Sequence, residues 1–233
     1  MSLSFIKYHG LGNDFILVNA LDLAHLADAP ELVVALCDRH TGIGADGLAL
    51  VLPTSDADFY MRLSNSDGSV AKMCGNGIRC FTRFVYEQGL WDGQGELSIM
   101  TDSGLRTTAI IDPTPGHFLV RANLKSPRLA PADVPTTLAP TTADGLVLDA
   151  PLDVDGVAVR VTTLSLGNPH AVVFVDDLAA VDIHVLGPRL ERHPVFPDRT
   201  NVHFVEVVDG QTLRMRTWER GAGLTLACGT GAS

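Results

Sequence analysis

The stretch Met73–Cys80, MCGNGIRC, decides the fold, because it places a cysteine directly before a glycine-bracketed turn and an apolar segment at helical spacing. A cysteine in this position lies at a helix N-terminus, where unpaired backbone N–H groups and the helix dipole favour a thiolate and can also bind a carboxylate. A second stretch of this kind, Ala227–Ala232 (ACGTGA), carries Cys228. The sequence therefore predicts two cysteine sites built in the same way, at Cys74 and at Cys228.

An internal repeat relates the two cysteines. Met61–Gly77 (MRLSNSDGSVAKMCGNG) aligns without a gap with Met215–Gly231 (MRTWERGAGLTLACGTG), with Met, Arg, Cys and both glycines in register. Further back, Leu11–Leu23 resembles Leu166–Leu178, and each copy carries Leu-Gly-Asn before an apolar strand. This order of matches predicts two copies of one fold, which can place the two cysteines face to face across a pseudo-twofold axis.

Length and composition indicate a globular protein of two domains. The chain has 233 residues, of which 46% are hydrophobic, and the repeat divides it into an N-terminal domain, residues 1–118, and a C-terminal domain, residues 119–233. The net charge of −10 argues against a nucleic-acid-binding surface, which would be basic. Neither a signal peptide nor a membrane span is recognisable, and four cysteines do not suggest a disulfide framework, so we expect free thiols in the cytoplasm.

Short strand patterns surround few helices in both halves. Between Cys74 and Gly89, apolar residues recur at helical spacing, and this helix is expected to form the core of its domain. A turn cluster, Asp112–Gly116, lies near the expected domain boundary. The second half repeats the strand patterns, but Ser233 follows Cys228 too closely for an equivalent helix. We therefore expect the second domain to be incomplete at its C-terminus.

Two motifs resemble cofactor or metal sites without meeting their requirements. Gly42–Gly47 (GIGADG) fits the dinucleotide pattern GxGxxG, but a helical pattern precedes it and a strand pattern follows it, so it indicates a turn. Cys74 and Cys80 lack the paired short spacings and the histidine partners of a structural zinc site. The sequence predicts neither a cofactor nor a metal.

Two thiols on opposite sides of a cleft suit one kind of reaction, in which a proton leaves one face of a carbon and another is added to the opposite face. One cysteine must be a thiolate and the other a thiol, and a helix N-terminus can lower a cysteine pKa from about 8.5 to roughly 3.5–7.5. Backbone N–H groups after each cysteine can bind a substrate carboxylate and stabilise its enolate-like charge. The residues that carry them are Gly75, Asn76, Gly229 and Thr230. This combination predicts α-epimerisation of an amino acid.

The motifs GLGNDF, GADG, NSDGS, MCGNGIRC, GNPH, TNV, ERGAG and ACGTGA, in this order, resemble those of the diaminopimelate epimerase family over nearly the whole chain. The resemblance implies an α/β (α+β) fold of two pseudo-symmetric domains, each a mainly antiparallel sheet wrapped around a central helix, with the active site between them. It also implies a small-molecule substrate, LL- or meso-diaminopimelate, and no pyridoxal phosphate or metal. A homodimer is compatible with it, whereas a nucleic-acid or membrane partner is not expected.

By position, the resemblance makes Cys74 and Cys228 the acid/base pair. His170 and Glu219 are expected to tune the pKa values of the thiols. Arg220 can bind a distal carboxylate through its planar guanidinium group, and Glu219 can accept from an ammonium group. The substrate contacts that the resemblance implies are Asn13, Asn65, Asn168, Asn201, Glu219 and Arg220, with the backbone at Gly75, Asn76, Gly229 and Thr230.

Two positions depart from the family pattern, and three other functions compete with epimerisation of diaminopimelate. Gly47 stands where a glutamine often lines the substrate pocket, and Leu224 where a glutamate is common, so we expect altered affinity rather than an altered reaction. A proline or hydroxyproline racemase of the same fold would need no distal clamp. A dithiol redox protein would use a disulfide between Cys74 and Cys228, although catalytic dithiols usually occur as Cys-x-x-Cys. A binding module would leave the paired cysteines unexplained.

Overall fold

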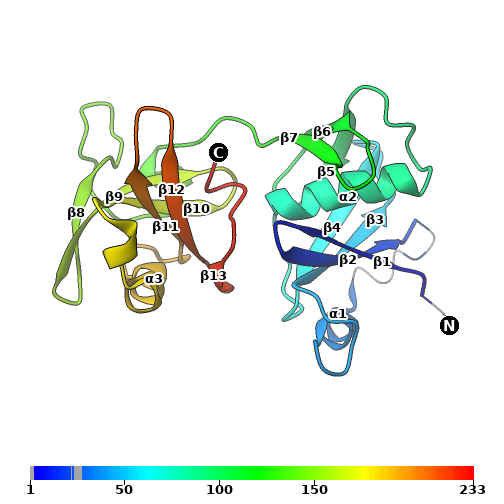
Figure 1. Cartoon of the computed structure of the whole chain (residues 1–233), viewed down its shortest axis with the longest axis horizontal. Helices are drawn as coiled ribbons and strands as arrows, with labels where there is room; N and C mark the ends of the chain where they lie inside the picture. Colours follow the sequence, from blue (N-terminus) through cyan, green and yellow to red (C-terminus); the bar gives the residue numbers. More distant parts are fainter. Residues whose placement is uncertain (1–2, 22, 24–27) are drawn as a thin grey trace. The chain divides into compact units, whose positions relative to one another are not determined.

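The computed structural model describes residues 3–21, 23 and 28–233, which form two compact units (Figure 1). Unit 1 extends to Leu124, and unit 2 comprises Lys125–Ser233. The sequence analysis placed the boundary earlier, after residue 118. Strand β7 (Leu119–Asn123) belongs to unit 1, because it is hydrogen bonded along its length to β6 (Arg106–Asp112).

Unit 1 contains a seven-stranded sheet whose strands follow one another in chain order. Neighbouring strands are antiparallel except for the parallel pairs β2–β3 and β4–β5. The first five strands are β1 (Ile6–Gly10), β2 (Asn13–Asn19), β3 (Gly47–Leu52), β4 (Phe59–Asn65) and β5 (Leu97–Met100).

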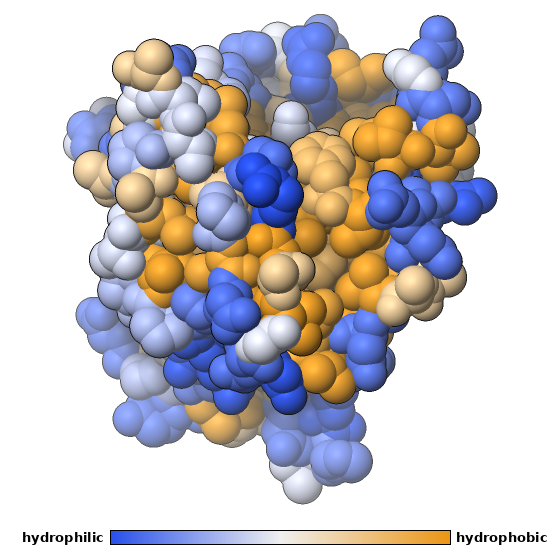
Figure 2. Space-filling model, turned by 90° about the vertical axis from the view of Figure 1, so that its left-hand side faces the viewer, coloured by the Kyte–Doolittle hydropathy of each residue, from blue (hydrophilic) through white to orange (hydrophobic). Residues whose placement is uncertain are grey.

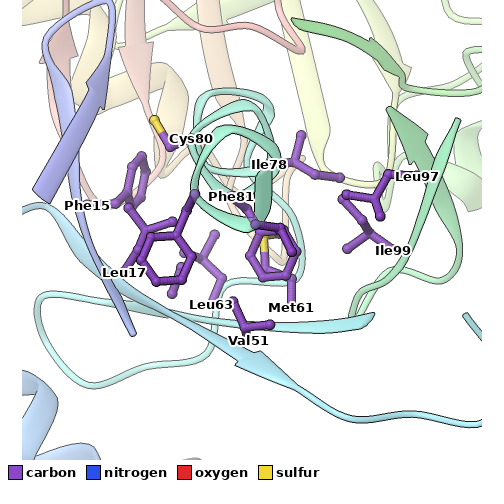
Figure 3. Packing of buried hydrophobic residues seen from close by; sticks show 13 residues of the cluster. Phe15, Leu17, Val51, Met61, Leu63, Ile78, Cys80, Phe81, Leu97 and Ile99 are labelled. Carbon is purple, nitrogen blue, oxygen red and sulfur yellow. The ribbon is translucent and has the colours of Figure 1, made fainter. Parts of the chain in front are cut away.

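Helix α2 (Gly75–Glu87) is the core of unit 1, as the sequence predicted. It packs against strands from both edges of the sheet, β1 and β2 at one and β6 and β7 at the other, so the sheet curves around it. Ile78 and Phe81 are fully buried and point from the helix toward the strands (Figure 3). Helix α1 (Pro30–Cys37) packs on the opposite face of the sheet.

Two of the four cysteines, Cys37 and Cys80, are core residues. Cys37 packs beneath α1 and Cys80 lies in the α2 cluster. Burial raises the pKa of Cys37 to about 11 and that of Cys80 to about 12, so both thiols stay protonated at neutral pH. They are unsuited to act as bases.

Unit 2 contains a six-stranded sheet in the order β13-β12-β11-β10-β9-β8, with α3 (Ile183–Glu191) packed on one face. Val202 and Phe204 of β11 lie in the core beneath α3, together with Ile183 and Leu190 of the helix. The strands are β8 (Ala150–Val154), β9 (Val157–Ser165), β10 (Pro169–Phe174), β11 (Asn201–Val207), β12 (Leu213–Glu219) and β13 (Gly223–Thr225); the short helices η2 (Pro131–Asp133) and η3 (Leu178–Ala180) complete the unit.

The strand pairing confirms the internal repeat. Strands β1–β2–β3–β4 pair antiparallel, parallel and antiparallel, and β9–β10–β11–β12 pair in the same sequence. The register also agrees, since Phe15 faces Gly47 in unit 1 and His170 faces Asn201 in unit 2. Each unit therefore brings its Gly-Asn turn and its cysteine to the same end of an equivalent sheet.

The units differ after their cysteines. In unit 1 the residues after Cys74 form α2, whereas Gly229–Ala232 of unit 2 form turns. The sheet face opposite α3 consequently has exposed apolar side chains, among them Phe174 (58% exposed), Val207 (58%) and Leu213 (62%). Figure 2 shows hydrophobic residues that reach the surface between hydrophilic ones. Within the described residues, no helix is long and apolar enough to cross a membrane.

Candidate active site

A glycine with positive φ precedes both Asn13 and Asn168. Gly12 has φ 84° and Gly167 has φ 99°, a conformation that residues with a Cβ rarely adopt. The turn formed by each glycine ends one element and delivers the next residue, Asn13 or Asn168, to the start of a strand. This local geometry explains why both copies of the repeat carry Gly-Asn.

Cys74 is the N-cap residue of α2. Its Sγ accepts a hydrogen bond from the Gly77 N–H group at 3.4 Å, and its thiol donates to Oδ1 of Asn13 at 3.5 Å. The Asn13 oxygen also accepts from Nδ2 of Asn76 at 3.3 Å. Three predicted site residues, Cys74, Asn13 and Asn76, thus lie together, and Gly75 between them begins the helix.

The orientation of the Asn13 amide is fixed by a network of charges. Its Nδ2 donates to Oδ2 of Asp46 at 2.8 Å. Arg39 donates to both carboxylate oxygens of Asp14 and also binds Asp46, and Lys7 lies 2.9 Å from Asp14. Despite the opposing effect of burial, hydrogen bonds from Arg39 and Lys7 hold the pKa of Asp14 well below its usual range. Because Nδ2 is bound to a carboxylate, the carbonyl oxygen of Asn13 faces the thiol of Cys74.

Cys228 lies within a different set of partners. Its Sγ is 3.5 Å from Oγ1 of Thr230, and that hydroxyl accepts from Nδ2 of Asn168 at 3.2 Å. Oδ1 of Asn168 is 3.0 Å from Nε2 of His170. The predicted residues Cys228, Thr230, Asn168 and His170 therefore form one group, with Gly229 in the same segment.

This group continues into the core through a second histidine. Nδ1 of His170 is 2.8 Å from Nε2 of His203, and Nδ1 of His203 is 3.0 Å from Oγ1 of Thr217. Both rings have no exposed surface. Burial, reinforced by the neighbouring His203 and by Arg220, lowers the pKa of His170 to about 3, and burial lowers that of His203 to about 4. Both imidazoles are therefore neutral at neutral pH.

Neutral histidines give the chain of hydrogen bonds a direction. The Asn168 oxygen can only accept, so His170 donates from Nε2 and accepts at Nδ1. His203 then donates from Nε2 and accepts from the Thr217 hydroxyl at Nδ1. At the other end, Thr230 accepts from Asn168, and its own proton is available for the sulfur of Cys228. Cys74 thus donates to the Asn13 carbonyl and accepts from the Gly77 N–H group, whereas Cys228 faces a hydroxyl that can donate to a thiolate.

The residues expected to hold the distal end of a substrate have hydrogen-bond partners other than the two cysteine groups, although Asn201 lies opposite His170 on the neighbouring strand. Asn65, exposed at the end of β4, donates to Oγ of Ser69 at 2.9 Å. Asn201 is buried, with Nδ2 donating to the Pro169 carbonyl and Oδ1 accepting from the Arg220 N–H group. The exposed Arg220 side chain donates to the Asp198 carbonyl at 3.0 Å, and Glu219 accepts from Thr225 at 2.7 Å.

His203 and Thr217 were not predicted from the sequence to belong to the site. In the repeat they stand where unit 1 has Ala49 and Leu63, and each pair faces one another across its strands. His170 likewise stands where unit 1 has Phe15, which packs against α2. The aligned blocks of the repeat place His170 opposite Phe15 and Thr217 opposite Leu63, which was a signal for Thr217, whereas His203 lies outside these blocks.

Gly231 lies against the ring of His203. A Cβ atom on Gly231 would lie 2.1 Å from Cε1 of His203, whereas one on Gly210 would meet nothing within 4 Å. We predict that Gly231→Ala displaces the Cys228 segment and lowers activity on the enzyme's substrate by about 10²-fold, the size of effect expected from a 1 Å misplacement. Steady-state kinetics with Gly210→Ala as the control measures this. Equal activity of the two variants would contradict the packing.

The two departures from the family pattern lie at different places in the fold. Gly47 begins β3, where a Cβ would lie 2.5 Å from the carbonyl oxygen of Ser64. This backbone therefore requires glycine, which explains the absence of a glutamine here. Leu224 lies in β13 with 45% of its surface exposed.

Solved structures show which class of fold this is. The chain is similar to a probable proline racemase from Agrobacterium radiobacter with a TM-score of 0.69 and 16% identity, over 98% of this chain and 74% of the other. A hydroxyproline epimerase from Agrobacterium vitis gives a TM-score of 0.67 and 18% identity, over the same shares of the two chains, 98% and 74%. At such identities the similarity establishes the two-unit fold alone.

Sequence similarity identifies the family within this fold. The family profile described as diaminopimelate epimerase matches residues 5–122 and 162–233. The chain is 47% identical to diaminopimelate epimerase 1 of Nostoc sp. over 100% of this chain and 82% of that protein. It is 50% identical to a diaminopimelate epimerase of Synechococcus elongatus over 100% and 81%, respectively. The chain belongs to the diaminopimelate epimerase family.

Proposed function

We propose that the protein is an isomerase that interconverts LL- and meso-diaminopimelate, in the biosynthesis of lysine and of peptidoglycan precursors. One observation carries the proposal: cysteines at equivalent positions of a structural repeat each lie within a hydrogen-bond group that includes the asparagine of a Gly-Asn turn. A single reactive thiol could serve many reactions. Two equivalent ones with opposite hydrogen-bonding partners suit a reaction that needs one base and one acid.

The hydrogen bonds support distinct resting states for the two cysteines. The Asn13 carbonyl favours a protonated Cys74, because a thiol can donate to it, whereas the Gly77 N–H group at the helix N-terminus stabilises the thiolate that forms in the reverse reaction. The Thr230 hydroxyl favours a Cys228 thiolate, because it can donate to sulfur. In this state Cys228 takes the α-proton from one face of the substrate, and Cys74 delivers its proton to the opposite face. The reverse reaction starts from the opposite pair of protonation states.

Substrate recognition would use the backbone N–H groups that follow each cysteine and the side chains expected to bind the far end of the substrate. N–H groups of Gly75 and Asn76, and of Gly229 and Thr230, would bind the carboxylate at the reacting carbon and stabilise the charge that develops there. At the other end of diaminopimelate, the Arg220 guanidinium would bind the second carboxylate, and Glu219 would accept from the second ammonium group, with Asn65 and Asn201 as polar contacts. His170 and Glu219 would also adjust the thiol pKa values.

The proposed chemistry needs no cofactor, because the two thiols supply both the acid and the base. It does need reduced cysteines, because only the thiol and thiolate forms can exchange a proton with the substrate. A reducing compartment, for which the cytoplasm is the natural choice, would keep them so.

The test is deuterium incorporation at the α-carbon of LL-diaminopimelate in D₂O under reducing conditions, followed by NMR and by chiral separation. We expect meso-diaminopimelate that carries deuterium at the inverted carbon, because the added proton comes from a thiol in exchange with solvent. Proline and hydroxyproline are assayed in parallel, since solved structures of the same fold include a probable proline racemase and a hydroxyproline epimerase. Turnover of proline without turnover of diaminopimelate would reject the proposed substrate.

A further inference from the structure

The Cys228 side of unit 2 contains a cluster of three metal-binding side chains that the proposed reaction does not explain. One ligand atom each from His170, His203 and Cys228 lies within 4.8 Å of the others. The histidines belong to the neighbouring strands β10 and β11, and the cysteine to the segment after β13. The histidines have no exposed surface and Cys228 is 3% exposed. Nitrogen and sulfur ligands converge here in a site shielded from water.

The outer partners of the two rings orient them as in a metal site. Asn168 accepts from Nε2 of His170, and Thr217 can accept from Nδ1 of His203 when its hydroxyl rotates. In that arrangement, Nδ1 of His170 and Nε2 of His203 present two lone pairs to each other at 2.8 Å. Either a proton or a metal ion must lie between them. Histidine ligands of metals almost always donate their other ring N–H in this way.

Zinc binding would require the three ligand atoms, which now lie within 4.8 Å of one another, to move to about 3.3–3.6 Å from one another. In a tetrahedral site with Zn–N of about 2.0–2.1 Å, two nitrogen ligands lie about 3.3 Å apart. The two rings would therefore separate by roughly half an ångström from their present 2.8 Å contact. Three protein ligands leave a fourth position for water. Calcium and magnesium prefer oxygen ligands, so the site would select a thiophilic ion.

Among the described residues of unit 1, no counterpart to this cluster is found. At the positions equivalent to His170, His203 and Thr217 it has Phe15, Ala49 and Leu63, which pack against α2. Cys74 consequently has no histidine pair beside it in the described structure. The two halves of the repeat thus provide an internal control, because a metal that simply bound a reactive thiol would not distinguish Cys74 from Cys228.

We propose that His170, His203 and Cys228 bind one thiophilic divalent ion such as Zn²⁺, and that this ion inhibits the enzyme. The ion binds the Cys228 thiolate, and any thiol form first loses its proton to solvent; the bound sulfur can then no longer exchange a proton with a substrate carbon. The inhibitory part rests on the proposed epimerase function; the binding part does not.

The test is titration of metal-free, reduced protein with Co²⁺, using a phosphine reductant and no added thiol. We expect one equivalent to bind and to give the visible bands of tetrahedral Co²⁺ with a thiolate-to-metal charge-transfer band in the near ultraviolet. Cys74→Ser should keep this spectrum, and Cys228→Ser should lose the charge-transfer band. His203→Ala should weaken binding, and Thr217→Val, which keeps all three ligands, should weaken it by about 10-fold or more. Circular dichroism identifies variants that fold.

Two results would overturn the site: a charge-transfer band that survives in Cys228→Ser, or one that disappears in Cys74→Ser. The same protein is then assayed with Zn²⁺ and after addition of a chelator. Chelator-reversible inhibition of epimerisation is expected, and full activity with the site occupied would overturn the inhibitory role. An enzyme that binds Co²⁺ as described but does not epimerise diaminopimelate when metal-free would instead count against the proposed function.

Discussion

Replacing either Cys74 or Cys228 by serine should lower kcat for epimerisation of diaminopimelate by about 10²–10⁴-fold, the usual contribution of a general acid or base. Serine is a much weaker acid than cysteine, so it serves poorly both as base and as proton donor. Neither variant should lose the fold, because serine can occupy the space of each thiol and keep hydrogen bonds to Asn13 or Thr230.

The two variants should differ in which substrate isomer still exchanges its α-proton. With Cys74→Ser, the Cys228 thiolate can still take a proton from one isomer and return deuterium to the same face without inversion. With Cys228→Ser, the opposite isomer should show this exchange. NMR of LL- and meso-diaminopimelate in D₂O measures exchange separately from conversion.

Cys80→Ala is the matched control for these variants. Cys80 lies in the α2 core, and its raised pKa, about 12, makes it a poor base. We expect this variant to retain kcat even if it is less stable, because it removes a core sulfur and no reacting group. A loss of kcat as large as in Cys74→Ser, in folded protein, would contradict the assignment of Cys74. Retention of most of the activity in either active-site variant would contradict the two-base mechanism.

The fold was largely predictable from the repeat and from strand and helix periodicity. Helix α2 occupies the predicted segment after Cys74, because Ile78, Phe81 and Val85 recur at the spacing that buries one face. The domain boundary was placed too early, because β7 is exposed at alternate positions in a short edge strand and has little apolar signal. Tertiary pairing with β6, rather than local propensity, forms that strand.

The site was predictable only as far as residue types and motif order allowed. Cys74 with Asn13, and Cys228 with Asn168, could be paired because each copy of the repeat carries both. His203 and Thr217 were missed, since their role depends on cross-strand register that places them beside His170. The opposite hydrogen-bonding states of the two cysteines could not be predicted either, because the amide orientations of Asn13 and Asn168 depend on Asp46 and His170.

Stability should fall steeply as the pH decreases from 7 to 5, because the protein buries two neutral histidines. The folded pKa values of His170 and His203 are about 3 and about 4, against about 6.5 for an unperturbed imidazole. Between these values the unfolded state binds two protons that the folded state excludes. Because the folded-state pKa values are lowered, the free energy of unfolding is highest above pH 6.5 and decreases as the pH falls toward 4.

The expected loss is about 2 kcal/mol per histidine between pH 7 and pH 5, since each excluded proton contributes about 1.4 kcal/mol per pH unit below 6.5. Urea unfolding at several pH values, with a chelator present, gives the free energy of unfolding. The window lies above the usual carboxyl pKa values, so the histidines dominate the slope.

His203→Gln separates the buried pair from the other histidines. Glutamine removes one excluded proton and keeps groups that can bond to His170 and Thr217, so the slope between pH 6 and 5 should fall by about 1.4 kcal/mol per pH unit. The control variant is His40→Gln, which changes an exposed histidine outside the buried pair. Equal slopes for wild type and His203→Gln would mean that His203 is protonated in the folded protein. The directed hydrogen bonds from Thr217 to Cys228, and with them the proposed resting thiolate, would then be wrong, because a charged His203 donates from both ring nitrogens.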